Sequence, residues 1–100
     1  MKSSTARSLA KQGNPSAIAH VINERLSPKG VIAHVTRQQH SIAITLEAAY
    51  VPQRTIFLPF IWQILKALDA KTIQNASLQA KRFNCEHISW FEELPLLPSK

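Results

Sequence analysis

Residues 31–48 read VIAHVTRQQHSIAITLEA, and this stretch decides the fold. In its second half, Ile42, Ile44 and Leu46 alternate with small or polar residues, which is typical of a strand that buries one face. The first half is short and rich in β-branched residues, and the polar residues 38–40 separate the two halves. The stretch therefore predicts an antiparallel hairpin that covers a core with one face only.

The pattern on either side of this hairpin predicts a helix. Upstream, Asn14 and Pro15 mark a helix start, because asparagine caps a first turn and proline is tolerated at the first helical position. Apolar residues then recur along one helical face: Ile18, Val21, Ile22 and Leu26. Downstream, the most hydrophobic segment repeats apolar residues at steps of three and four, and it predicts a second helix that begins within residues 55–59 and ends near Asp69.

The rest of the chain completes a two-layer fold. Residues 72–83 alternate apolar and polar side chains and predict a third strand. Residues 89–95 are predicted to form a single turn that inserts Trp90 and Phe91 into the edge of the core. The order is helix, strand, strand, helix, strand. Because two strands have a polar face, we expect an α+β sandwich with both helices on one face of a three-stranded, mainly antiparallel sheet.

Length and composition predict one domain of 100 residues. We expect a flexible basic N-terminal tail over residues 1–13, a folded domain over 14–94 and a C-terminal tail over 95–100. No apolar run approaches the roughly 20 residues that span a bilayer, and the N-terminus lacks the apolar core of a secretion signal. With a single cysteine, Cys85, these features predict a cytoplasmic protein that does not associate with membranes.

Net charge gives the first indication of function. Twelve Lys and Arg against six Asp and Glu give +6, and such a balance attracts nucleic acid and other polyanions. The residues expected to contact phosphate groups are Arg37, Lys71, Lys81 and Arg82, together with the basic tail. The simpler interpretation of the same residues is a solvated surface. The sheet faces expected to be open hold no aromatic residue, which argues against sequence-specific recognition of single strands.

The sequence contains no recognisable motif for catalysis or for metal binding. With Gly13 and Gly30 as the only glycines, neither a phosphate-binding loop nor a dinucleotide fingerprint can be written. No nucleophile stands in a recognisable pattern with a base, and one cysteine cannot supply a zinc site of familiar spacing. We therefore expect no enzyme activity, no cofactor and no metal.

Several short motifs resemble those of a family of small domains found in cyanobacterial proteins. They are the helix start Asn14-Pro15-Ser16-Ala17-Ile18-Ala19, the turn Pro28-Lys29-Gly30, the pair Phe60-Ile61, and Lys81-Arg82 followed by a tryptophan. The resemblance covers about residues 13 to 94. It implies the expected fold and a cyanobacterial origin, and the family has no assigned activity.

Two classes of function follow. The first is a non-catalytic binding module that contacts nucleic acid or another polyanion through basic residues. The alternative is a protein-interaction or self-association module that uses the open sheet face, an unpaired strand edge or the apolar residues 94–98. The two classes differ in whether the basic side chains gather on one face.

Overall fold

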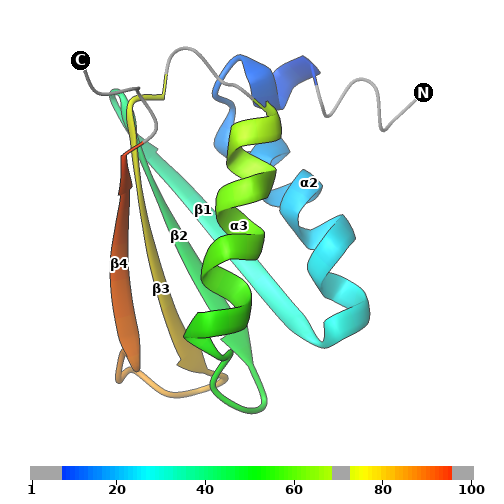
Figure 1. Ribbon diagram of the computed structural model, residues 1–100, viewed down its shortest axis with the longest axis vertical. Helices are drawn as coiled ribbons and strands as arrows, with labels where there is room; N and C mark the ends of the chain where they lie inside the picture. The colour runs from blue at the N-terminus through cyan, green and yellow to red at the C-terminus, as the bar shows by residue number, and fades with distance from the viewer. Residues whose placement is uncertain (1–7, 69–72, 96–100) are drawn as a thin grey trace.

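The computed structural model describes residues 8–68 and 73–95. The elements are α2 (Pro15–Leu26), the 3-10 helix η1 (Ser27–Lys29), β1 (Val31–Gln38), β2 (Ser41–Ala48), α3 (Arg54–Leu68), β3 (Asn75–Arg82) and β4 (Trp90–Pro95). The strands form one sheet in the order β1-β2-β3-β4, and α2 and α3 cover the same face of it (Figure 1). The predicted α+β class is confirmed.

The sheet differs from the expected three mainly antiparallel strands. Residues 90–95, predicted as a single turn, form β4, which pairs antiparallel with β3. Strands β2 and β3 run parallel, because the connection through α3 returns the chain to the end of the sheet where β2 began. Alternation along a strand reports which residues are buried, but it does not report the direction of the neighbouring strand.

The side chains expected to enter the core from residues 89–95 divide between the two faces of β4. Trp90 packs against the core, and its indole N–H donates to the Pro52 carbonyl at 2.8 Å. Phe91 points to the opposite face, where 52% of its surface is exposed. The expected insertion of both aromatic rings is therefore wrong for Phe91, because successive side chains of a strand alternate between faces.

Helix α2 starts where the sequence predicts. The Asn14 side-chain oxygen accepts a hydrogen bond from the Ala17 N–H at 3.0 Å, and Pro15 occupies the first helical position. The helix ends at Leu26 and passes into η1, which is capped by Gly30, whose φ of 75° is a left-handed conformation that suits glycine. Helix α3 begins at Arg54, one residue before the predicted window, so Pro59 lies within the helix.

Part of the predicted N-terminal tail packs on the domain. Residues 8–11 form a helical turn, and Ala10 is fully buried. One small buried residue gives too weak a periodicity to be recognised in the sequence. Residues 1–7 and 96–100, which belong to the two predicted tails, lie outside the described residues.

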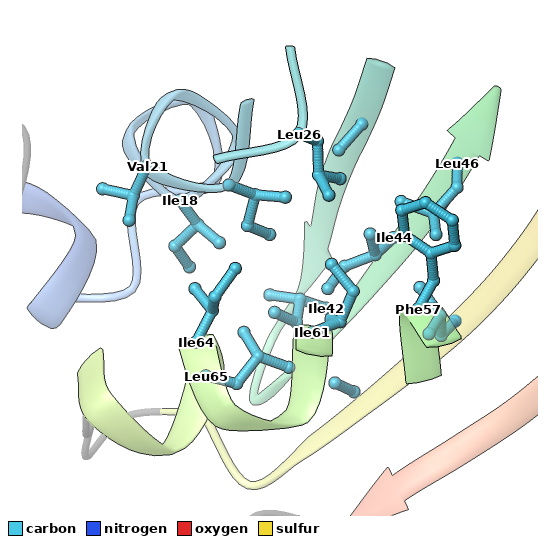
Figure 2. Packing of buried hydrophobic residues seen from close by; sticks show 14 of the residues in the cluster. Ile18, Val21, Leu26, Ile42, Ile44, Leu46, Phe57, Ile61, Ile64 and Leu65 are labelled. Carbon is cyan, nitrogen blue, oxygen red and sulfur yellow. The ribbon is translucent and has the colours of Figure 1, made fainter. Parts of the chain in front are cut away.

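The core lies between the two helices and the inner face of the sheet (Figure 2). The predicted strand face is confirmed, since Ile42, Ile44 and Leu46 are all buried. The register places these residues beside Ala76, Leu78 and Ala80 of β3. The largest fully buried side chains are Ile18, Ile22, Leu26, Ile44, Leu46, Ile61, Leu68, Ile73 and Leu78.

Candidate functional site

One edge of the sheet, strand β1, is blocked by the chain itself. The Ala33 N–H donates to the Asn23 side-chain oxygen at 2.7 Å, and the Asn23 amide donates back to the Ala33 carbonyl at 3.0 Å. Further along the strand, the Arg37 guanidinium donates to the Gly13 carbonyl at 2.9 Å and to the Gln39 carbonyl at 2.7 Å. Helix α2 lies beside β1 (Figure 1). Asn23 thus occupies backbone groups that an incoming strand would need.

The other edge, strand β4, is open in the described part of the chain. Figure 1 shows no described element beyond it. The Ser89 N–H donates to the Ala80 carbonyl at 2.8 Å, so Ala80 turns its backbone groups toward β4. Because this direction alternates along paired strands, Phe91 and Glu93 turn their N–H and C=O groups away from β3. These two residues present a backbone edge to which another strand can be added.

The outer face of the sheet is likewise uncovered by any described helix (Figure 1). The register gives its side chains as Ile32, His34, Thr36, Gln38, Ser41, Ala43, Thr45, Glu47, Asn75, Ser77, Gln79, Lys81, Phe91, Glu93 and Pro95. Most are small or polar, and Phe91 is the large aromatic residue among them. The strand pattern predicts no aromatic residue on this face, because residues 90–95 are predicted to form a turn rather than a strand. The signal was the alternation in residues 90–95, where Trp90 and Leu94 share one face and Phe91 lies on the other.

Three outer-face side chains form an ion cluster across β1, β2 and β3. Glu47 Oε1 lies 3.1 Å from His34 Nε2, and Glu47 Oε2 lies 3.2 Å from Lys81 Nζ. Burial would raise the pKa of Glu47, but hydrogen bonds from Lys81 and His34, with their charge, outweigh it and lower the pKa from its ordinary value. No described nucleophile is hydrogen-bonded to His34, so the cluster joins strands and lacks the parts of a nucleophilic site.

The cluster predicts a pH-dependent contribution to stability. Since the pKa of Glu47 is lowered in the folded state, its contribution is present above the ordinary pKa of 4.5 and is lost as the pH falls through the folded-state pKa. We expect Glu47→Gln to lower the free energy of unfolding by about 1 kcal/mol at neutral pH, and by much less at about pH 3. Urea denaturation at both pH values measures this difference.

The control for this prediction is Glu86→Gln, because Glu86 is exposed and makes no ion pair with a described residue. That variant should match the wild type at both pH values. An equal loss for Glu47→Gln at neutral and acidic pH would contradict a role for its charge.

A hollow of about 440 Å³ opens on the outer face next to the β4 edge. Its outer-face lining residues are Ser41, Asn75, Ser77, Phe91, Glu93 and Pro95. The small side chains of β2 and β3 leave the space, and the larger residues of β4 border it. Among the described residues, no cation forms an ion pair with Glu93. The hollow thus combines an apolar wall with one exposed carboxylate.

Of the basic residues predicted to contact phosphate, the three that the structure describes do not share one surface. Arg37 is bonded to backbone carbonyls at the β1 edge, and Lys81 is paired with Glu47 on the outer face. Arg82 is exposed at the end of β3, at the opposite end of the sheet from Arg37, since the two pair with Ala48 and Ile42 of β2. Lys71 lies outside the described residues.

Positive charge gathers instead on the helical layer, formed by α2, η1 and α3. Its charged residues are Arg25, Lys29, Arg54 and Lys66 against Glu24. Within the described structure, only Arg54 of these four pairs with a carboxylate, that of Glu92. The Lys29 ammonium lies 5.5 Å from the centre of the Phe60 ring. The Lys66 ammonium lies 5.7 Å from that of Trp62.

Negative charge gathers along β4 and the loop that precedes it. Residues 83–95 contain Glu86, Glu92 and Glu93 and no Lys or Arg. The segment forms β4 and the loop that leads into it. A chain with a net charge of +6 therefore presents an acidic strand at its open edge.

Other indications of function are few. In the described ranges, no three His, Cys, Asp or Glu side chains gather as metal ligands. None of the described helices is long and apolar enough to cross a membrane. Comparison of the chain with family models, curated proteins and solved structures finds no match.

Proposed function

We propose that this protein is a non-catalytic protein-interaction module that binds an extended segment of a partner as a fifth strand on β4. The observation that carries the proposal is the contrast between the two sheet edges. At β1, the Asn23 side chain satisfies the outward backbone groups of Ala33. At β4, the outward backbone groups of Phe91 and Glu93 meet no described element. An unpaired edge of this kind is a template for strand addition.

The side chains of β4 favour a partner segment over a second copy of β4. Antiparallel pairing of two β4 strands about their centre would set Glu92 and Glu93 of one copy close to those of the other, and like charges across a strand pair are destabilising. A partner strand without acidic residues avoids this repulsion. The exposed Phe91 ring would add an apolar contact to the main-chain hydrogen bonds.

The test uses peptides selected from a displayed library of random 12-residue sequences against the full chain. We expect the selected peptides to shift the backbone NMR signals of β4. Phe91→Pro should abolish this binding, because it removes the outward N–H and leaves the β3–β4 hydrogen bonds in place. Phe91→Ala should weaken binding only in part, because it retains the N–H.

The matched control is Ile32→Ala, which removes an exposed apolar residue from the outer face at the blocked edge. Its affinity for the selected peptides should equal that of the wild type. Circular dichroism of each variant checks that the fold is retained. Failure to select peptides that bind β4, or full binding by a folded Phe91→Pro variant, would overturn the proposal.

A second candidate function, polyanion binding, is favoured by the charge of the helical layer. Of its basic residues, Arg25, Lys29 and Lys66 are exposed and pair with no described carboxylate. Titration of labelled duplex DNA at several salt concentrations tests this candidate. Replacing Lys29 and Lys66 with Gln should flatten the log-log salt slope by about 1.8, which corresponds to two phosphate contacts.

The sequence-predicted pair Lys81 and Arg82 provides the comparison for that titration. If the helical layer binds the phosphates, changing this pair to Gln should leave the slope nearly unchanged. A slope that depends on the pair would place the contact on the sheet. Absence of salt-dependent binding would remove polyanion binding as a function of this chain.

A further inference from the structure

We propose that the hollow beside β4 selects a lysine or arginine side chain from the added strand. This inference rests on strand addition as the proposed function and names the chemistry of the partner. The partner is a basic extended segment of another protein. The hollow, the Glu93 carboxylate and the acidic character of residues 83–95 all bear on this choice.

The geometry of strand pairing brings one partner residue beside the hollow. A strand added to β4 lies about 4.8 Å beyond it, and alternate side chains of that strand project over the outer face. The partner residue opposite Glu93 has its Cβ about 5 Å from the Glu93 Cβ. From there, a long side chain extends across β4 toward Ser77, into the space of about 440 Å³. A short side chain at this position would leave the hollow unfilled.

Charge decides which long side chain fits. The neighbouring Glu92 is paired with Arg54 on the inner face of β4, whereas Glu93 on the outer face has no described cationic partner. An ammonium or guanidinium group at the mouth of the hollow would supply that partner through a charge-assisted hydrogen bond. A carboxylate or phosphate in the same place would be repelled by Glu93.

The lining of the hollow suits the rest of a basic side chain. The methylene stem of lysine or arginine packs well against apolar surface, and the Phe91 ring provides such a surface at the border of the hollow. The hydroxyl group of Ser77, which pairs with Glu93 in the register of β3 and β4, offers an oxygen acceptor to the N–H donors of the head group.

The experiment measures the affinity of the selected peptides and their variants for the full chain. We expect the peptides that bind β4 to share one basic residue at a fixed position. Replacing that residue with glutamine should weaken binding about tenfold, as expected for the loss of one charge-assisted contact. Glu93→Gln should weaken the basic peptide by a similar factor and leave the affinity of the glutamine peptide unchanged, which a double-mutant cycle quantifies.

Two further variants separate charge from shape. Glu92→Gln is the matched control, because Glu92 lies on the inner face and should not affect the preference for a basic residue. Ser77→Leu, which fills the hollow, should remove the preference without removing strand addition. The NMR shifts of β4 report whether each variant still binds peptide at this edge.

The possible results distinguish this inference from the proposed function. Peptides that bind β4 with no shared basic residue, or with an affinity unaffected by Glu93→Gln, overturn the inference and leave strand addition in place. Absence of peptides that bind β4 overturns both. A shared basic residue whose effect disappears in Glu93→Gln supports both.

Discussion

Replacing Ile44 with Ala is expected to lower the free energy of unfolding by about 2 to 5 kcal/mol. Ile44 is fully buried at the centre of β2, between β1 and β3 (Figure 2). Helices and sheet both contribute to the core around it, so the surrounding structure has little freedom to close over a missing side chain. Equilibrium unfolding in urea measures the loss.

The companion variants define the cause of this loss. Ile44→Val removes one methylene and should cost about 0.5 to 1.5 kcal/mol. Thr36→Ala, on the outer face of β1, should stay within about 0.5 kcal/mol of the wild type. A loss of less than 1 kcal/mol for Ile44→Ala would show that this face of β2 does not form the core.

Asn23→Ala is expected to lower the free energy of unfolding by about 1 to 3 kcal/mol, because it removes both side-chain hydrogen bonds to the backbone of Ala33. The same change opens the β1 edge. We therefore also expect the variant to self-associate more than the wild type at high concentration, through the backbone groups that Asn23 covers. Urea denaturation and sedimentation velocity measure the two effects.

Asn23→Asp gives the matched comparison. Its carboxylate can still accept from the Ala33 N–H, but it cannot donate to the Ala33 carbonyl, so its stability should lie between those of the wild type and Asn23→Ala. Glu24→Ala changes the next residue of α2, which is exposed and pairs with His20, and should have little effect. Equal stability of Asn23→Ala and the wild type would contradict a role for Asn23 in closing the β1 edge.

The outcome at Asn23 illustrates what local pattern does not reveal. The helical spacing places Asn23 away from the apolar face of α2, where a polar residue faces solvent in an ordinary amphipathic helix. In the folded chain, β1 runs beside α2, and Asn23 meets the backbone of Ala33, ten residues later in the sequence. The position on the helix was predictable, and the partner was not.

The candidate site was even less predictable from the sequence. Its two principal residues, Phe91 and Glu93, belong to β4, which is six residues long and follows a loop without a compact turn signal. Of the basic residues predicted to contact phosphate, Arg37 and Arg82 lie at opposite ends of the sheet. The number of basic residues in a sequence does not show which of them share a surface in the fold. The positive charge of the helical layer depends on α2 and α3 lying on the same face of the sheet (Figure 1).

The sequence by itself determined the start of α2 at Asn14 and Pro15 and the buried face of β2. These features depend on contacts within a few residues or on a short repeat of apolar side chains, so a short stretch of sequence is enough to predict them. The tertiary structure alone decided that β3 runs parallel to β2, that β4 forms the open edge, and that β1 is closed by α2. Strand neighbours and edge contacts join residues far apart in sequence, and their pairing depends on the path of the whole chain.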